Sequence, residues 1–157
     1  MKQRTRVFIA VGVIVLLSGL VLGVDLLRRH NTELPPGSVP IYQNGRIIAS
    51  SVPEDLASLE KVSFVDDEEG KTQEGWLLRD VLALYLSLDG LGAETLITVS
   101  SSSREKSADL TWAAVNDPGN MVMFDLSGRG TLKLVSRSEV LATRDEWVQD
   151  VDRIEVR

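Results

Sequence analysis

An uninterrupted apolar stretch near the amino terminus constrains this chain more than any other feature. Residues Val7–Leu27 read VFIAVGVIVLLSGLVLGVDLL, in which Asp25 is the one charged residue. A helix of about 21 residues rises roughly 31 Å, which matches the hydrocarbon thickness of a bilayer. The stretch therefore predicts a single-pass transmembrane anchor at residues 7–27.

Charges beside the apolar stretch indicate its orientation. Lys2, Arg4 and Arg6 lie in residues 1–6, which predicts a short cytoplasmic stub and places the rest of the chain outside the cytoplasm. Arg28 and Arg29 on the far side reduce this bias. A secretory signal cleaved before Val24 is the alternative, although the apolar run exceeds the usual signal length.

Composition restricts the chemistry available to the rest of the chain. Residues 28–40 form a polar linker rich in proline, and residues 41–157 have the length of one domain. From residue 31 onward, 12 Lys and Arg stand against 22 Asp and Glu, so 12 − 22 gives −10. This acidic balance disfavours nucleic acid as a partner. The chain has no cysteine and its one histidine, His30, lies in the linker, so neither a His-based triad nor a zinc site is expected.

The pattern of the domain predicts an α+β fold with a mostly β core and a few short flanking helices. An Asn44-Gly45 turn between Ile41-Tyr42 and Arg46–Ile48 is the strongest hairpin signal. Further strands are expected at residues 62–65, 95–100, 121–125 and 131–136, and at the carboxyl terminus, where Ile154 and Val156 alternate with polar residues.

Helices are expected at three places. Pro53–Leu59 follows a capping box of Ser51 and Glu54. Gly75–Leu86 has a wide apolar face, with Leu77, Val81 and Leu84 in one inward row. A third helix of one or two turns is expected at residues 109–115.

Two polar runs invite a functional interpretation. The acidic run Asp66–Glu69, before Gly70, could bind calcium, but its contiguous carboxylates lack the alternation of a calcium loop and favour a solvated hairpin end. The run Ser100–Ser103, with Arg104 and Lys106, could bind an anion, although a flexible loop also explains it.

Four segments together resemble a known family. They read GWLLRDVLALYL, LITVSSSS, GTLKLVSR and, at the carboxyl terminus, WVQDVDRIEV. Their order resembles the sulfite-oxidase-type molybdopterin-binding domain, in the short form found in small exported proteins. The resemblance covers residues 41–157 and implies a twisted, mostly β core with short helices at its sides.

The resemblance implies less about chemistry. Complete members hold molybdenum through a cysteine thiolate and grip the pterin phosphate with arginine and histidine, whereas this domain has neither cysteine nor histidine. Where the family tends to have Gly-Pro, this chain has Gly130-Thr131. No resident cofactor is therefore expected, and residual binding of molybdopterin or a small anion is assigned to Ser101, Ser102, Arg104, Arg129 and Lys133.

Two functions of different classes are compatible with these features. The preferred one is a non-enzymatic, membrane-tethered extracytoplasmic module, acting as an accessory subunit or protein-binding domain of a membrane complex. The alternative is a pterin- or small-anion-binding domain related to molybdopterin-dependent oxidoreductases. No catalytic residue and no metal ligand is assigned in either case.

Overall fold

A tight hairpin opens the fold, as the Asn44-Gly45 turn predicts. In the computed structural model, which describes residues 34–157, strand β1 (Val39–Gln43) pairs antiparallel with β2 (Arg46–Ser51). Asn44 and Gly45 have φ values of +50° and +76°, which is the backbone that a two-residue hairpin turn requires. Strand β1 also takes in Val39 and Pro40, which the composition of residues 28–40 assigned to the linker.

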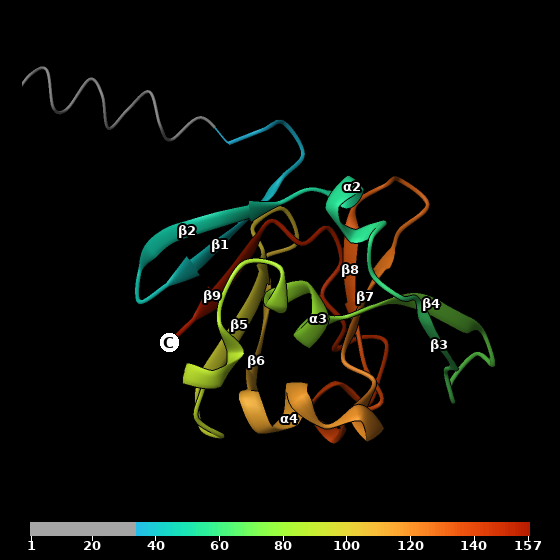
Figure 1. Cartoon of the computed structure of the whole chain (residues 1–157). Coiled ribbons are helices and arrows are strands. Elements are labelled where there is room, and N and C mark those ends of the chain that lie inside the picture. The colour runs from blue at the N-terminus through green and yellow to red at the C-terminus, as the bar shows by residue number, and fades with distance from the viewer. Residues whose placement is uncertain (1–33) are drawn as a thin grey trace, which may run out of the picture. The chain divides into compact units, whose positions relative to one another are not determined.

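Five strands form the first sheet, in the order β2-β1-β9-β5-β6 (Figure 1). β5 (Leu96–Ser101) lies between β6 (Lys106–Thr111) and β9 (Arg153–Val156), and β9 pairs in parallel with β1. Ile154 and Val156 are buried while Arg153 and Glu155 lie on the wetter face, which confirms the alternation predicted for the terminal strand.

Four strands form the second sheet, in the order β3-β4-β7-β8. They are β3 (Val62–Val65), β4 (Thr72–Leu77), β7 (Met123–Leu126) and β8 (Leu132–Val135), and all neighbours run antiparallel. Buried side chains from both sheets, among them Ile97, Phe124 and Leu134, belong to one hydrophobic core.

The helices are short and contribute their apolar sides to this core. They are α2 (Pro53–Leu56), α3 (Leu78–Ala83) and α4 (Trp112–Asn116), with 3₁₀ turns η1 (Leu88–Gly90), η2 (Pro118–Asn120) and η3 (Glu139–Leu141). The described residues thus form the mixed, mostly β fold that the pattern predicts. Within residues 34–157 no helix has the length and apolarity needed to cross a bilayer. The anchor predicted at Val7–Leu27 lies outside the described residues.

Two predicted helices are partly wrong, because strand pairing continues into them. The helix expected to begin at Gly75 begins at Leu78, since Gly75–Leu77 pair with β7. Leu84, expected in the inward row of that helix, lies beyond its end and is 41% exposed. The helix expected from Asp109 begins at Trp112, because β6 pairs with β5 as far as Thr111, whose hydroxyl then caps the helix.

Two local predictions are also corrected. The first predicted helix ends earlier, at Leu56, and its capping contact is one residue later than expected, since the Val52 amide donates to the Asp55 carboxylate. The acidic run does end a hairpin, but Asp66 is only 4% exposed and accepts hydrogen bonds from the Glu69 amide and the Gln73 side chain. The Asp66 carboxylate therefore shapes the turn, while Asp67, Glu68 and Glu69 are exposed as the prediction of a solvated hairpin end requires.

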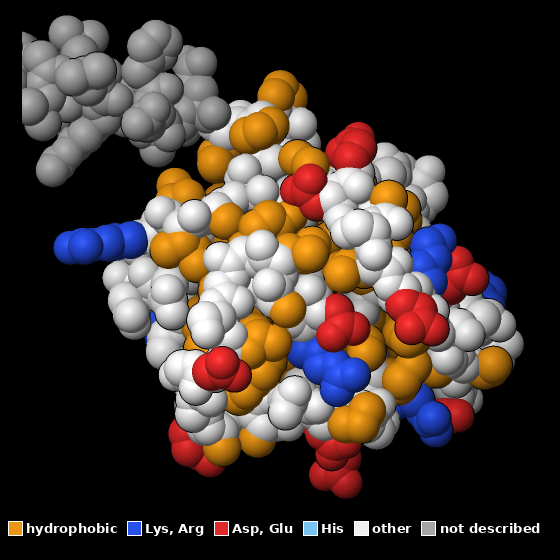
Figure 2. All heavy atoms as spheres, in the orientation of Figure 1, with side chains coloured by type: hydrophobic (Ala, Val, Ile, Leu, Met, Phe, Trp, Pro, Cys, Tyr) orange, Lys and Arg blue, Asp and Glu red, His pale blue; other side chains and the backbone are white. Residues whose placement is uncertain are grey.

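The surface is consistent with the acidic composition of the domain. In the view of Figure 2, acidic side chains are spread over the face singly or in small groups, between hydrophobic and basic ones. Dispersed charge of this kind favours solubility and forms no large single-sign field on the face shown.

Candidate functional site

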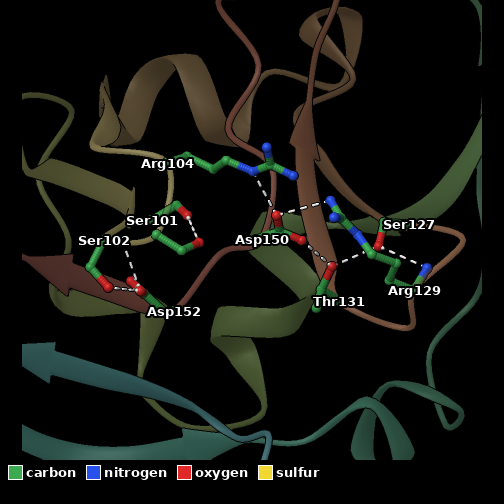
Figure 3. A network of polar contacts seen from close by, with 9 residues as sticks. Ser101, Ser102, Arg104, Ser127, Arg129, Thr131, Asp150 and Asp152 are labelled. Carbon is green, nitrogen blue, oxygen red and sulfur yellow. Dashed lines mark hydrogen bonds and ion pairs between the residues drawn. The ribbon is translucent and has the colours of Figure 1, made fainter.

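Three polar segments from distant parts of the sequence meet around one carboxylate. They are the turn between β5 and β6, the turn between β7 and β8, and the segment that leads into β9 (Figure 3). The β7–β8 turn is closed by hydrogen bonds between Ser127 and Thr131 and has Gly130 at a φ of +78°, a backbone that glycine adopts without strain.

Asp150 is the carboxylate on which these segments converge. It accepts hydrogen bonds from the Thr131 hydroxyl (2.7 Å), Arg104 Nε (2.7 Å) and Arg129 Nη2 (3.1 Å). Its side chain is 18% exposed, and its φ of +54° lies in the left-handed region that only a few non-glycine residues tolerate. The Thr131 hydroxyl, followed by Arg104, holds the pKa of the Asp150 carboxyl below its ordinary value.

Asp152 organises the serines of the neighbouring turn in a similar way. Its Oδ2 accepts hydrogen bonds from both the amide (2.8 Å) and the hydroxyl of Ser102. The adjacent Ser101 is 2% exposed and its hydroxyl pairs with that of Ser103 at 3.2 Å. The serine run is therefore an ordered hairpin turn tied to the segment before β9.

The structure brings together four of the five residues assigned to anion binding: Ser101, Ser102, Arg104 and Arg129. Two guanidinium groups share the Asp150 carboxylate, so the cations expected to hold an external anion already hold an internal one. Asp150 thus occupies the position where that anion would lie.

Lys133 lies apart from that group, in strand β8. Its ammonium contacts Asp125 (2.8 Å) and Gln73 Oε1 (2.8 Å) and lies 5.5 Å from the centre of the Trp147 ring. With only 14% of its side chain exposed, Lys133 bridges strands of the second sheet. Lys133 therefore does not belong to the group that contacts Asp150, and its assignment to anion binding stays a prediction.

The acceptors of this site were not identified from the sequence. Asp150, Asp152 and Thr131 stand in no recognisable motif, and they are close to the serine turn only because β9 pairs with β5. The one available signal was the pair of aspartates immediately before the terminal strand, which the pairing of that strand would bring beside the β5–β6 turn.

Two cavities open beside the Arg104–Asp150 ion pair. The larger, of about 480 Å³, is lined by Ser38, Ser103, Arg129, Thr131, Asp150 and Asp152 over an apolar floor. The smaller, of about 210 Å³, is lined by Arg104, Lys106, Arg144 and Trp147, together with Asp145 and Gln149. The larger volume lies within the range of small-molecule sites, roughly 300–1,000 Å³, and the smaller volume lies below it.

Comparison with models of known protein families gives no match, and comparison with curated proteins gives none either. Among residues 34–157, no three acidic or imidazole side chains are grouped as a metal site would require. The chemistry assigned to the site therefore rests on its geometry alone.

Proposed function

We propose that this chain is a non-enzymatic module, tethered to a membrane by Val7–Leu27, that binds a protein partner outside the cytoplasm. In this role it is an accessory subunit of a membrane complex. The anchor prediction supports the tether, and two features of the described residues support binding without catalysis.

The observation that carries the proposal is the exposed edge strand β2. It is one of the two edge strands of the five-stranded sheet, and its side chains Ile47 and Ile48 are 39% and 40% exposed. An edge strand offers unpaired backbone donors and acceptors to which an extended segment of a partner can add. Exposed isoleucines beside that edge supply apolar contact for such a segment.

Three groups with shifted pKa values, Asp66, Tyr85 and Asp150, are poorly suited to proton transfer near neutral pH. A general acid or base works best when its pKa lies near the operating pH. Hydrogen bonds from Thr131 and Arg104 lower the pKa of Asp150, and a hydrogen bond from the Glu69 amide lowers that of Asp66. Burial, followed by the hydrogen bond to Asp55, raises the pKa of Tyr85 to about 12. These three shifts all lead away from neutrality.

Co-purification tests the proposal. The full-length chain, tagged at its carboxyl end and extracted in a mild detergent, is expected to carry a stoichiometric second polypeptide. Ile48→Lys should lose it, whereas Val140→Lys should keep it, since Val140 is 54% exposed but lies in η3, outside β2. A chain that purifies as a monomer with no companion would contradict the proposal, as would a reporter fusion that places residue 157 in the cytosol.

A second candidate function is favoured by the smaller cavity. Arg104, Lys106 and Arg144 line it, and within residues 34–157 the Lys106 ammonium bonds to the Asp145 carbonyl and to no carboxylate. The Arg144 guanidinium lies 5.5 Å from the Trp147 ring, which is itself buried at 4% exposure. Three cations around one cavity suit a pterin or another small anion, as the resemblance to sulfite-oxidase-type domains would imply.

Metal analysis and an absorbance spectrum separate the two candidates. Molybdenum near one equivalent in the freshly purified chain would overturn the first proposal. A colourless, metal-free protein that shows no saturable binding of inorganic phosphate or pterin would overturn the second. Arg144→Gln is the variant expected to weaken such binding, and Arg46→Gln on the exposed end of β2 is its control.

A further inference from the structure

The larger cavity offers a different chemistry from the smaller one. Its polar wall carries Asp150, Asp152 and Arg129, and its floor is apolar, formed by Val39, Pro53, Leu132 and Val151. We propose that this cavity binds a neutral polyhydroxylated ligand, a sugar, through the carboxylates of Asp150 and Asp152 and the guanidinium of Arg129.

The acceptors of the cavity are partly unused. Both hydrogen bonds from Ser102 go to Oδ2 of Asp152, and among the described residues Oδ1 of Asp152 receives none. Oδ1 of Asp150 receives one, from Thr131. Carboxylate oxygens have two lone-pair sites each, so these atoms can accept hydrogen bonds from adjacent hydroxyl groups of one ligand.

The donors are also partly unused. Arg129 is 63% exposed in its side chain and uses one nitrogen, Nη2, to contact Asp150, so its remaining N–H groups can point to a ligand oxygen. Ser103, an exposed residue in the same lining, adds a hydroxyl whose hydrogen-bond partner among the described residues is Ser101. A sugar hydroxyl both donates and accepts, which matches a wall that carries both kinds of group.

The charge balance favours a neutral ligand. Asp150 and Asp152 supply two negative charges, and Arg104 and Arg129, both paired with Asp150, supply two positive ones. An anion would meet two carboxylates at this wall, whereas a cation would meet Arg129 in the lining and Asp150, whose charge Arg104 already offsets, so neither gains a large net attraction. The apolar floor suits the C–H face of a sugar ring, and 480 Å³ lies in the range of small-molecule sites.

Amide NMR on the full-length, isotope-labelled chain tests the assignment. The micelles should be of a polyoxyethylene detergent, because alkyl glycosides would compete for the site. D-glucose, N-acetyl-D-glucosamine and maltose are the neutral probes, and inorganic phosphate is the anionic one. At least one sugar is expected to cause saturable shifts at Gly130, Thr131, Asp150 and Asp152, while phosphate leaves these amides unchanged.

Two variants make the result decisive. Asp152→Asn and Arg129→Gln should each weaken sugar binding about tenfold, since each removes a charged hydrogen-bond partner. Arg129 is the more exposed, so its replacement leaves the core intact. Asp67→Asn in the exposed β3–β4 hairpin is the matched control and should bind as the parent chain does.

Three outcomes would overturn the inference: no saturable shift with any sugar, shifts with phosphate instead of sugar, or undiminished sugar binding by both variants. The sugar site is independent of the edge strand β2, so loss of the protein partner in Ile48→Lys leaves the sugar titration unaffected. Failure of the partner-binding proposal therefore shows in the co-purification, and failure of the sugar proposal shows in the titration.

Discussion

Gly75 lies directly against the backbone of Phe124 on the neighbouring strand. A Cβ atom built on Gly75 would overlap the carbonyl oxygen of Phe124 and lie 2.6 Å from its carbonyl carbon. Gly75 pairs with Asp125 in the β4–β7 ladder, and both strands continue into the core. Glycine is thus required here for a close approach of two strands and not for a turn.

We expect Gly75→Ala to destabilise the domain by about 1–3 kcal/mol, because the obstructing atoms are backbone and cannot rotate away. Gly128→Ala is the control, since a Cβ at Gly128 meets no atom within 4 Å. Chemical denaturation of both variants measures the difference. Equal midpoints would show that β4 and β7 separate at little cost, contrary to the geometry.

Gly75 also marks the limit of what the sequence pattern could predict about the fold. The letters GWLLRDVLALYL have a helical period, and from Leu78 onward a helix does form. Trp76 and Leu77 are buried in a strand, where residues covered on both faces show no alternation. Only the partner strand β7, far along the chain, decides between the two interpretations. By contrast, the hairpin at Asn44-Gly45 is encoded by the turn residues themselves and was predictable.

The residues of the candidate site also fall into those that the sequence could predict and those that it could not. Ser101, Ser102 and Arg104 stood out because a run of hydroxyls beside a cation can bind an anion, and Arg129 was added by the resemblance to molybdopterin-binding domains. Asp150 and Asp152 did not, because the chain has 22 acidic side chains from residue 31 onward and composition cannot say which of them faces an arginine. Their role depends on the pairing of β9 with β5, which is long-range information.

The lowered pKa of Asp150 should make the free energy of unfolding depend on pH in the acidic range. Its folded pKa lies below the ordinary value of about 3.9, so the folded state binds its proton less readily than the unfolded state. The stabilisation is therefore present above the unfolded pKa and is lost as pH falls through the folded one. Asp150→Asn should be less stable than the parent at pH 7, and the difference should shrink between about pH 4 and pH 2.

Denaturant unfolding at pH 7 and pH 3 measures this difference. Asparagine tolerates positive φ, so the substitution changes the charge while it leaves the backbone of Asp150 unstrained. Asp67→Asn serves as the control and should track the parent at both pH values. A gap between Asp150→Asn and the parent that stays constant with pH would show that the ion pairs of Asp150 contribute nothing to folding.

We expect Lys133 to stabilise the folded domain through its contacts across the second sheet. Its ammonium joins Asp125 and Gln73 in a setting where the two charged side chains are 14% and 18% exposed. Lys133→Met leaves Asp125 without its cation, and we expect a loss of about 2 kcal/mol, of which Asp125→Leu in the same chain should restore part. Lys61→Met is the matched control.

The comparison with Lys61 is informative because its ammonium also lies near a tryptophan ring, at 5.3 Å from that of Trp76, and pairs with Glu74. Its side chain is 50% exposed, so we expect its loss to cost less than about 1 kcal/mol. Thermal unfolding followed by tryptophan fluorescence measures all these variants. If Lys133→Met were as stable as Lys61→Met, the bridge across the second sheet would have no energetic role.

Tyr85 and Asp55 form a contact between α2 and the chain segment just after α3. The Tyr85 hydroxyl donates to Asp55 Oδ2 at 2.7 Å, and burial, followed by this hydrogen bond, raises the pKa of Tyr85 to about 12. Because the folded pKa exceeds the unfolded value of about 10, the stabilisation is complete below pH 10 and is lost as pH rises towards 12. Tyr85→Phe should lower the free energy of unfolding by about 1 kcal/mol at pH 7, with a gap to the parent that narrows between pH 10 and pH 12.

Absorbance at about 295 nm should show a tyrosinate step near pH 12 in the parent that Tyr85→Phe lacks, since ionisation of the phenol raises absorbance there. A step that persists in the variant would assign the high pKa to another tyrosine and remove the Asp55 contact as its cause.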